Sequence, residues 1–266
     1  MANKISSNLG IPLTPTQIEK FSDGETYVRI KEKVRGDDVF LIQTLGNPVN
    51  ENLMELLVTI DALKRASARR INIICPYLAY SRQDRKVISR EPVTAKLVAN
   101  LISKAGADRV VTVDLHSDQI QGFYDIPFDH FVGYPQFANY LKDEDYEDMV
   151  IAAPDTGAMK RCRKMAGLLL VPLVVLDKRR VGHNQSEVVR VIGDVENKLV
   201  VIVDDIIDTG GTITNAAKVL KQAGAKDIII CATHALLSGS AVGRLEISPI
   251  SKILLLDTVP LSEKKN

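Results

Sequence analysis

Residues 199–212 read LVVIVDDIIDTGGT, an apolar run that ends in two aspartates and continues through a third into a glycine-containing turn. Because Leu199–Val203 is continuously apolar and rich in β-branched residues, it predicts a strand buried on both faces of a parallel sheet. The next segment, Ile213–Ala223, has the spacing of an amphipathic helix. A strand, a glycine turn and a helix in this order predict an α/β fold with a ligand site at the turn.

The turn has the features of a phosphate-binding loop. Thr209–Thr212 offers backbone N–H groups and two hydroxyls at the start of a helix, where the helix dipole favours an anion. Gly210 and Gly211 let a ligand approach the backbone closely. Asp204 and Asp205, just upstream, suit the hydroxyl groups of a sugar. The stretch predicts a sugar-phosphate ligand; the alternative is a plain glycine turn with solvated aspartates.

The composition is that of an ordinary globular protein, since the 266 residues are 45% hydrophobic and 25% charged. A chain of this length can bury one large core or two smaller ones. Its 34 basic and 33 acidic residues leave a net charge of +1, so no overall field favours nucleic acid or an anionic membrane surface. We therefore expect no nucleic acid and no membrane as partners, and expect anions to be bound locally.

Cysteine usage and the N-terminal segment bear on the cellular compartment. Cys75, Cys162 and Cys231 lie in or near apolar segments without metal-ligand spacing, which favours core packing in a reducing cytosol. The first residues, MANKISSNLGIPL, contain no apolar signal core, and no segment approaches the ~20 apolar residues of a membrane span. We expect a cytoplasmic protein.

Short apolar runs alternate with amphipathic helical segments along the chain, the pattern of a mostly parallel sheet flanked by helices. The expected strands are Val39–Gln43, Ile71–Pro76, Val110–Asp114, Met149–Ala152, Leu173–Leu176, Val200–Asp204, Ile228–Thr233 and Ile253–Leu256. The expected helices are Asn52–Ser67, Pro92–Ala105, Tyr134–Lys142, Ala158–Leu169 and Ile213–Ala223.

The two halves of the chain share this pattern. The strand, helix and strand within residues 39–76 parallel those within residues 200–233, which a duplicated α/β domain explains. The acidic stretch 143–148 (DEDYED) is expected to be solvated and to separate the two domains. We therefore expect one domain over residues 1–143 and a second over residues 144–266.

Two segments carry cations at the ends of expected strands. Tyr80–Lys86 (YSRQDRK) includes Arg82 and Gln83, and a cationic loop at the carboxyl end of a parallel strand suits a polyphosphate. Lys178 and Arg180 lie in DKRR, before a polar loop, where they are placed to neutralise charge on a transferring phosphoryl group. In both cases the alternative is a solvated basic surface.

A metal site and a base-binding turn are further candidates. His116 and Asp155 follow the expected strands Val110–Asp114 and Met149–Ala152, and mixed oxygen and nitrogen ligands beside a phosphate favour Mg²⁺ over Zn²⁺. A structural histidine is the alternative for His116. The turn Phe21–Glu25 (FSDGE) combines an aromatic ring with carboxylates and suits stacking on a base, or is a simple Asp-Gly turn.

Taken in order, the segments FSDGE, SRQDRK, VDLHSDQIQGF, DKRR and VDDIIDTGGT closely resemble those of the ribose-phosphate diphosphokinases, or phosphoribosyl pyrophosphate synthetases, of the common bacterial type. The resemblance covers nearly the whole chain, and LHSDQIQGF and SRQDRK are specific to this family and its close relatives. It implies two tandem phosphoribosyltransferase-like domains, each a mostly parallel sheet flanked by helices, related by a pseudo-twofold axis. It also implies transfer of the diphosphoryl group of ATP to the 1-hydroxyl of ribose 5-phosphate, giving 5-phosphoribosyl 1-diphosphate and AMP.

The resemblance implies roles for the candidate residues of the second domain. The residues that would hold the 5-phosphate are Asp208, Thr209, Gly210, Gly211 and Thr212. Asp204 and Asp205 would bind the ribose hydroxyls, while Lys178 and Arg180 would stabilise the transition state from a mobile loop.

The resemblance also implies an ATP site and a metal site. Arg82 and Gln83 would bind ATP, and they would be helped by residues that in the family reach a neighbouring subunit's nucleotide, namely Phe21, Asp23, Gly24 and Glu25. His116 and Asp155 would serve the Mg²⁺ ion. The family assembles as homohexamers, which leads us to expect a homo-oligomer here.

The resemblance begins after the family's usual first strand and ends before its usual last strand and helix. All the motifs named above are nevertheless present. We therefore expect the diphosphokinase activity. The alternatives are a catalytically weak or regulatory homologue with shortened termini, and a phosphoribosyltransferase that uses the same DTGGT loop.

Overall fold

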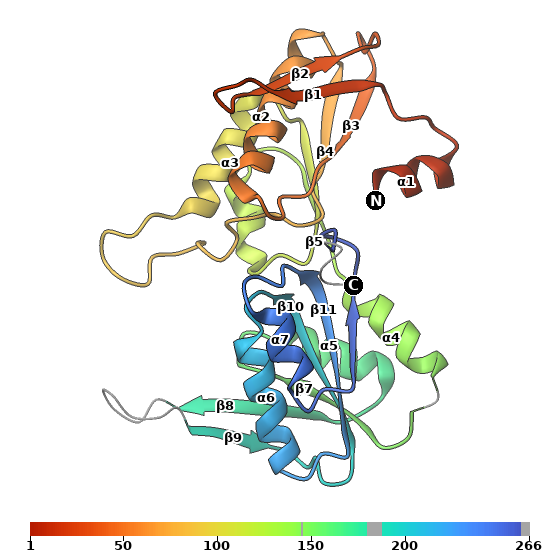
Figure 1. Ribbon diagram of the computed structural model, residues 1–266, viewed down its shortest axis with the longest axis vertical. Helices are drawn as coiled ribbons and strands as arrows, with labels where there is room; N and C mark the ends of the chain where they lie inside the picture. Colours follow the sequence, from red (N-terminus) through yellow and green to blue (C-terminus); the bar gives the residue numbers. More distant parts are fainter. Residues whose placement is uncertain (145, 180–187, 262–266) are drawn as a thin grey trace. The chain divides into compact units, whose positions relative to one another are not determined.

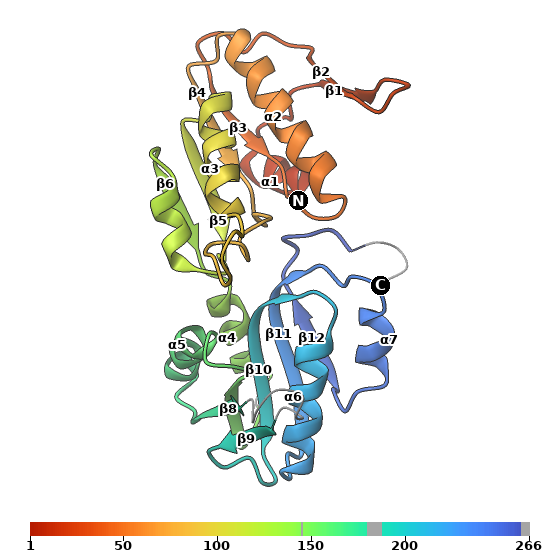
Figure 2. The ribbon, with the colours of Figure 1, turned by 90° about the vertical axis from the view of Figure 1, so that its left-hand side faces the viewer.

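The computed structural model describes residues 1–144, 146–179 and 188–261, and it divides into two compact units on either side of the Phe131–Val132 bond. Among the residues described, no helix is both long and apolar enough to cross a membrane. Each unit is an α/β structure with its own sheet (Figures 1 and 2).

The first unit is built on a four-stranded parallel sheet in the order β3-β4-β5-β6. Helices α2 and α3 contact each other and lie side by side in both views (Figures 1 and 2). The antiparallel hairpin β1-β2 contacts α2. The elements are α1 (Ala2–Leu9), β1 (Thr16–Lys20), β2 (Thr26–Ile30), β3 (Asp38–Ile42), α2 (Val49–Arg65), β4 (Arg70–Ile74), α3 (Thr94–Ala105), β5 (Arg109–Val113), the 3-10 helix η1 (Asp118–Phe123) and β6 (Phe128–Phe131).

The second unit has a six-stranded sheet in the order β12-β11-β10-β7-β8-β9, in which the pair β8-β9 is antiparallel and every other pair is parallel. One face is covered by α4 and α5 and the other by α6 and α7 (Figure 2). The elements are α4 (Tyr134–Asp143), β7 (Met149–Ala153), α5 (Met159–Leu169), β8 (Leu173–Arg179), β9 (Val188–Ile192), β10 (Leu199–Ile207), α6 (Gly211–Gln222), β11 (Asp227–Ala235), α7 (Ala241–Glu246) and β12 (Lys252–Leu255).

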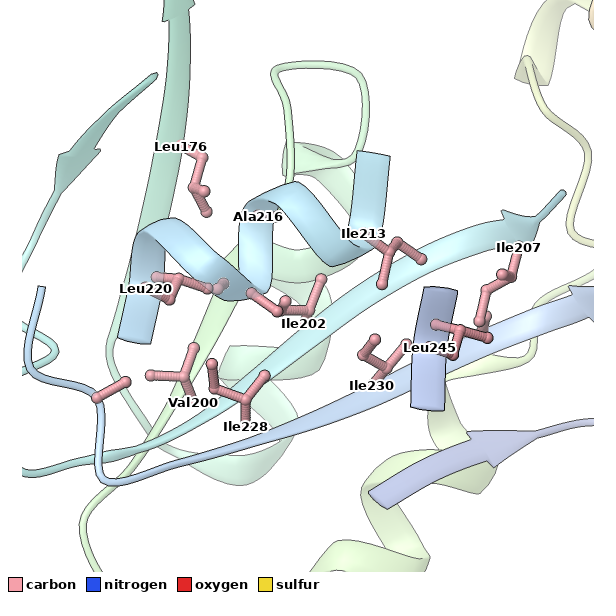
Figure 3. Close-up of a cluster of buried hydrophobic side chains, with 14 of the residues drawn as sticks. Leu176, Val200, Ile202, Ile207, Ile213, Ala216, Leu220, Ile228, Ile230 and Leu245 are labelled. Carbon is pink, nitrogen blue, oxygen red and sulfur yellow. The ribbon is translucent and has the colours of Figure 1, made fainter. Parts of the chain in front are cut away.

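Strand β10 lies between β7 and β11 and is buried on both faces, as its uninterrupted apolar run predicts. Val200 and Ile202 face α6, whereas Val201 and Val203 belong to the core beneath α4 and α5. Figure 3 shows three side chains of α6 directed onto β10 and β11; these are Ile213, Ala216 and Leu220. This packing fixes the start of α6 at the carboxyl end of β10.

All the strands and helices expected from the apolar runs are present, with shifted ends. The sequence did not predict α1, the β1-β2 hairpin, η1, β6, β9 or α7, which are all short elements of four to eight residues. The unit boundary lies before α4, whereas the acidic stretch placed it after residue 143. The reason is that Phe137, Ala138 and Leu141 of α4 pack into the core of the second unit.

We predict that Ile202→Ala lowers the free energy of unfolding of the second unit by about 3 kcal/mol, since this fully buried side chain would leave a cavity under α6. Ile247→Ala is the matched control, because Ile247 is 81% exposed and its truncation should cost less than about 0.5 kcal/mol. Urea unfolding followed by circular dichroism measures both. Equal losses in the two variants would contradict this account of the core.

Candidate functional site

The two central aspartates lie inside β10, two to three residues before the strand ends. The strand continues to Ile207 because Ile206 and Ile207 still pair with His234 and Ala235 of β11. Asp205 is buried and Asp204 is half-buried. The carboxylates therefore sit on a rigid strand, although the sequence had placed Asp204 at the strand's end and Asp205 beyond it.

A guanidinium from the neighbouring helix joins these two carboxylates. Nη1 of Arg161, on α5, lies 2.7 Å from Oδ1 of Asp205 and 3.2 Å from Oδ1 of Asp204. The backbone N–H of Asp205 also donates to Oδ1 of Asp204 at 2.9 Å. All three side chains are less than one fifth exposed, so the cluster is largely shielded from water.

The protonation of this cluster is set by opposing effects. Burial, followed by the adjoining Asp205 carboxylate, raises the pKa of Asp204 well above its ordinary value, and the Arg161 guanidinium opposes that rise. Keeping two buried carboxylates so close together costs free energy even with a cation beside them. Such an arrangement is typical of a ligand site rather than of a core that is optimised for stability.

The segment after β10 forms a tight turn into α6. Gly210 has φ of +75°, the left-handed conformation that glycine adopts without strain, and the helix begins at Gly211, two residues earlier than the sequence predicted. Gly210 is the N-cap and has no side chain of its own to bond the first-turn N–H groups, and a helix start of this kind suits an anion. Thr209 and Thr212 are exposed beside them.

The β11-α7 segment supports this turn from its other side. The Ser238 N–H donates to the Asp208 carbonyl at 2.8 Å, and the Arg244 guanidinium donates to the Thr209 carbonyl at 3.2 Å. Because a peptide's carbonyl and N–H point in opposite directions, holding the Thr209 carbonyl turns the Gly210 N–H away from Arg244. The turn is thus held in a fixed conformation by hydrogen bonds to its backbone.

Asp155 follows β7, which pairs in parallel with β10, so both strands bring their carboxylates to the same edge of the sheet. Its Oδ1 accepts the Ala158 N–H at 3.0 Å, which holds the side chain at the start of α5. In the described part of the chain, no three metal-binding side chains of His, Cys, Asp or Glu gather together. One or two carboxylates beside a phosphate suit Mg²⁺, which keeps several waters and uses substrate oxygens as ligands.

Of the two candidate catalytic cations, Lys178 and Arg180, the structure describes only the backbone position of Lys178. Lys178 lies on β8, opposite Val189 of β9 in the antiparallel pair. Arg180 lies outside the described residues.

In the first unit, the YSRQDRK and VDLH segments follow the neighbouring parallel strands β4 and β5, at one edge of the sheet. Arg82 is exposed, and the Gln83 side chain accepts a 2.6 Å hydrogen bond from the Thr94 hydroxyl at the start of α3. His116 is exposed in the loop after β5. Next to it, the Leu115 N–H donates to Nε2 of His130 at 3.0 Å, so that β6 supports this loop.

The FSDGE segment is the tip of the β1-β2 hairpin. Phe21 is 56% exposed, and its N–H and carbonyl bond Glu25 and Gly24, respectively. The Glu25 N–H donates to the Asp23 carboxylate at 3.1 Å. Phe21, Asp23, Gly24 and Glu25 therefore form one turn that presents an aromatic ring to the surface.

Sequence reasoning missed three side chains that support these segments: Arg161, Arg244 and His130. Arg161 lies 43 residues before Asp204, and no local spacing connects them. Arg244 contacts Thr209 across 35 residues from a helix that the sequence did not predict. His130 lies on β6, a strand that the sequence did not predict.

Comparison with known proteins covers both units. Residues 1–106 match the N-terminal domain of ribose phosphate pyrophosphokinase, and residues 136–247 match the phosphoribosyl transferase domain. The chain is 51% identical over 265 residues to the ribose-phosphate pyrophosphokinase of Bacillus caldolyticus, covering 100% of this chain and 84% of that protein. It is 52% identical over 266 residues to that of Clostridium perfringens, covering 99% of this chain and 83% of the relative.

A solved structure gives the same result. The crystal structure of phosphoribosylpyrophosphate synthetase from Mycobacterium smegmatis matches with a TM-score of 0.94 and 44% sequence identity, over 100% of this chain and 87% of that one. The family resemblance inferred from the motifs is confirmed, as is the two-part α/β fold. The chain belongs to the ribose-phosphate pyrophosphokinase family.

Proposed function

We propose that this chain transfers the diphosphoryl group of ATP to the 1-hydroxyl of ribose 5-phosphate. The observation that carries the proposal is one strand end, at β10, that supplies both a carboxylate pair for sugar hydroxyls and a helix start for a phosphate. In the reaction, the 1-hydroxyl oxygen bonds to the β-phosphorus of ATP as the bond from that phosphorus to the oxygen of AMP breaks. The hydroxyl proton is released, and the products are 5-phosphoribosyl 1-diphosphate and AMP.

Residues of the second unit orient ribose 5-phosphate in this proposal. Asp204 and Asp205 accept hydrogen bonds from the ribose hydroxyls, and their rigid strand fixes the sugar. The 5-phosphate lies on the turn formed by Asp208, Thr209, Gly210, Gly211 and Thr212, which donates from N–H groups and hydroxyls. Binding at both ends of the sugar holds the 1-hydroxyl in a single orientation. Holding the reacting group in place in this way lowers the entropic part of the activation barrier.

Residues of the first unit bind ATP in this proposal. Arg82 and Gln83 contact the nucleotide from the loop after β4, where a guanidinium suits phosphate oxygens. The hairpin turn contributes Phe21, Asp23, Gly24 and Glu25 to a nucleotide, in keeping with a homo-oligomer in which a hairpin serves a neighbouring subunit. The exposure of Phe21 supports a stacking role.

We assign Mg²⁺ as the cofactor, with Asp155 and His116 serving it. The carboxylate of Asp155 at the edge of the second sheet fits a hard cation that is also bound by phosphate oxygens. When bound, the ion would neutralise negative charge on the diphosphoryl group. Lys178 and Arg180 stabilise the charge that develops on the transferring group.

The buried thiols support a cytoplasmic location. Cys75, Cys162 and Cys231 are all free and buried. Burial raises the pKa of both Cys75 and Cys162 to about 12, which keeps them unreactive as thiols. Three unpaired cysteines suit a reducing compartment.

The alternative functions are not favoured. A phosphoribosyltransferase would account for the match in the second unit but not for the match of residues 1–106 to the N-terminal domain of the diphosphokinases. A regulatory homologue would have no need of a carboxylate cluster that costs stability. All the motifs named for the reaction are present in the sequence.

Purified protein incubated with ATP, Mg²⁺ and ribose 5-phosphate should form AMP and 5-phosphoribosyl 1-diphosphate in equal amounts, because each transfer gives one of each. Chromatography of the nucleotides and the sugar phosphate measures both products. A reaction without ribose 5-phosphate is the control and should give no AMP. Formation of ADP instead of AMP would contradict the proposal, since it would mean that only the terminal phosphoryl group moves.

Lys178→Ala should lower kcat roughly 10²–10³-fold, because a cation that stabilises developing charge acts chiefly in the transition state. The KM values for both substrates should change less than about threefold. Lys218→Ala, at an exposed lysine on α6, is the control and should leave kcat unchanged. Steady-state kinetics measures kcat and both KM values for the two variants. An unchanged kcat in Lys178→Ala would show that Lys178 does not stabilise the transition state.

Asp204→Asn should make the folded protein more stable than the wild type at pH 8, because the raised pKa means that folding disfavours the ionised form. In the wild type, the stability contributed by protonated Asp204 is complete below the unfolded-state pKa of ~3.9 and is lost as the pH rises towards the raised folded-state pKa. The asparagine side chain does not titrate, so the variant shows no such loss. The same change should weaken ribose 5-phosphate binding at least tenfold.

Urea unfolding at several pH values measures the stability effect. Asp194→Asn is the contrast, since Asp194 is exposed and the hydrogen bond from Lys198 lowers its pKa. That variant should gain no stability at pH 8. A wild type that is at least as stable as Asp204→Asn across the whole pH range would refute the proposed cost of the buried carboxylate.

A further inference from the structure

Arg161 is a half-buried cation to which the proposed reaction gives no role so far. Its guanidinium reaches from α5 to β10 and bonds Oδ1 of Asp204 and Oδ1 of Asp205. We infer that Arg161 is a positioning residue that sets the geometry of the two carboxylates for the ribose hydroxyls. The inference rests on the proposed function and deepens it, because it makes recognition of the sugar depend on a residue outside the DDIIDTGGT segment.

Contacts at the start of α5 hold the Arg161 guanidinium next to the carboxylates of Asp204 and Asp205. Cys162, the next residue, is fully buried, and its thiol lies 3.4 Å from the Val203 carbonyl and 3.7 Å from the Ala152 carbonyl. These contacts tie the first turns of α5 to β10 and β7. The backbone of Arg161 is therefore held at a fixed position relative to the two aspartates. The Arg161 side chain is 18% exposed.

Two adjacent carboxylates need such a partner to serve as paired acceptors. Neighbouring negative charges repel each other, and burial favours the protonated acid, which gives up an acceptor oxygen and becomes a donor. Two hydroxyls on adjacent sugar carbons both donate, so the site that binds them must present acceptors at a fixed separation. A single guanidinium nitrogen, Nη1 of Arg161, bonds both aspartates, so it supplies the opposite charge and holds the two acceptor oxygens beside one point.

A purely stabilising role explains the cluster less well. Replacing buried ion pairs by apolar side chains often leaves stability unchanged or raises it, so stability alone does not account for a guanidinium between two carboxylates. The geometric role has a distinct consequence. Perturbing the guanidinium should affect a ligand with both ribose hydroxyls more than a ligand that lacks one of them.

The test compares ribose 5-phosphate with 2-deoxyribose 5-phosphate by isothermal titration calorimetry, using the full chain. Arg161→Lys keeps the charge but replaces the planar guanidinium with a shorter-reaching ammonium whose donors rotate freely. Arg163→Lys is the matched control, because Arg163 is exposed on the same helix. We expect Arg161→Lys to weaken ribose 5-phosphate binding about tenfold and 2-deoxyribose 5-phosphate binding less than threefold. Arg163→Lys should match the wild type.

Steady-state kinetics gives a second readout. In Arg161→Lys, the KM for ribose 5-phosphate should rise about tenfold while the KM for ATP changes less than twofold. Equal loss of affinity for the two sugar phosphates, or no loss for either, would overturn the inference. So would a lysine variant that no longer folds by circular dichroism, since that result would assign the guanidinium to folding.

Failure of the proposed function has a different signature. A wild-type protein that does not bind ribose 5-phosphate, or that forms no AMP with ATP and ribose 5-phosphate, would refute the reaction itself. A wild-type protein that is active and discriminates between the two sugar phosphates, together with an Arg161→Lys variant that discriminates equally well, would refute only the role of Arg161.

Discussion

Continued pairing of β10 with β11 is the constraint on which the candidate site depends. Because Ile206 and Ile207 remain in register with His234 and Ala235, the strand carries its aspartates inside the sheet rather than on a loose loop. The turn that follows is then short, and α6 begins at Gly211 over the same sheet. The apolar contacts between α6 and β10 hold the two ends of the proposed sugar-phosphate site at a fixed distance (Figure 3).

The same constraint has an energetic cost, which explains why Arg161 matters. A carboxylate pair on a buried strand loses hydration that a loop would have kept, and the raised pKa of Asp204 expresses that loss. The guanidinium offsets part of it and orders the oxygens at the same time. Stability and ligand recognition are thus opposed at this strand end, as is common where binding requires charged groups away from water.

The sequence predicts most of this arrangement and misses the parts that depend on distant contacts. The buried run of β10, the glycine turn and α6 have local signatures, and the ordered motifs predict the family. Arg161, Arg244 and His130 have no such signature, because each acts on a segment brought near by sheet order or by helix packing. The acidic stretch at residues 143–148 was a reasonable boundary by charge, but the apolar face of α4 assigns that helix to the second unit.

The most direct test of the account is a crystal structure of the chain with ribose 5-phosphate bound. The account predicts the 5-phosphate on the N–H groups of Thr209–Thr212 and the ribose hydroxyls on Asp204 and Asp205, with the Arg161 contacts retained. A sugar phosphate bound instead at the YSRQDRK loop, or one whose hydroxyls do not reach the two aspartates, would contradict it.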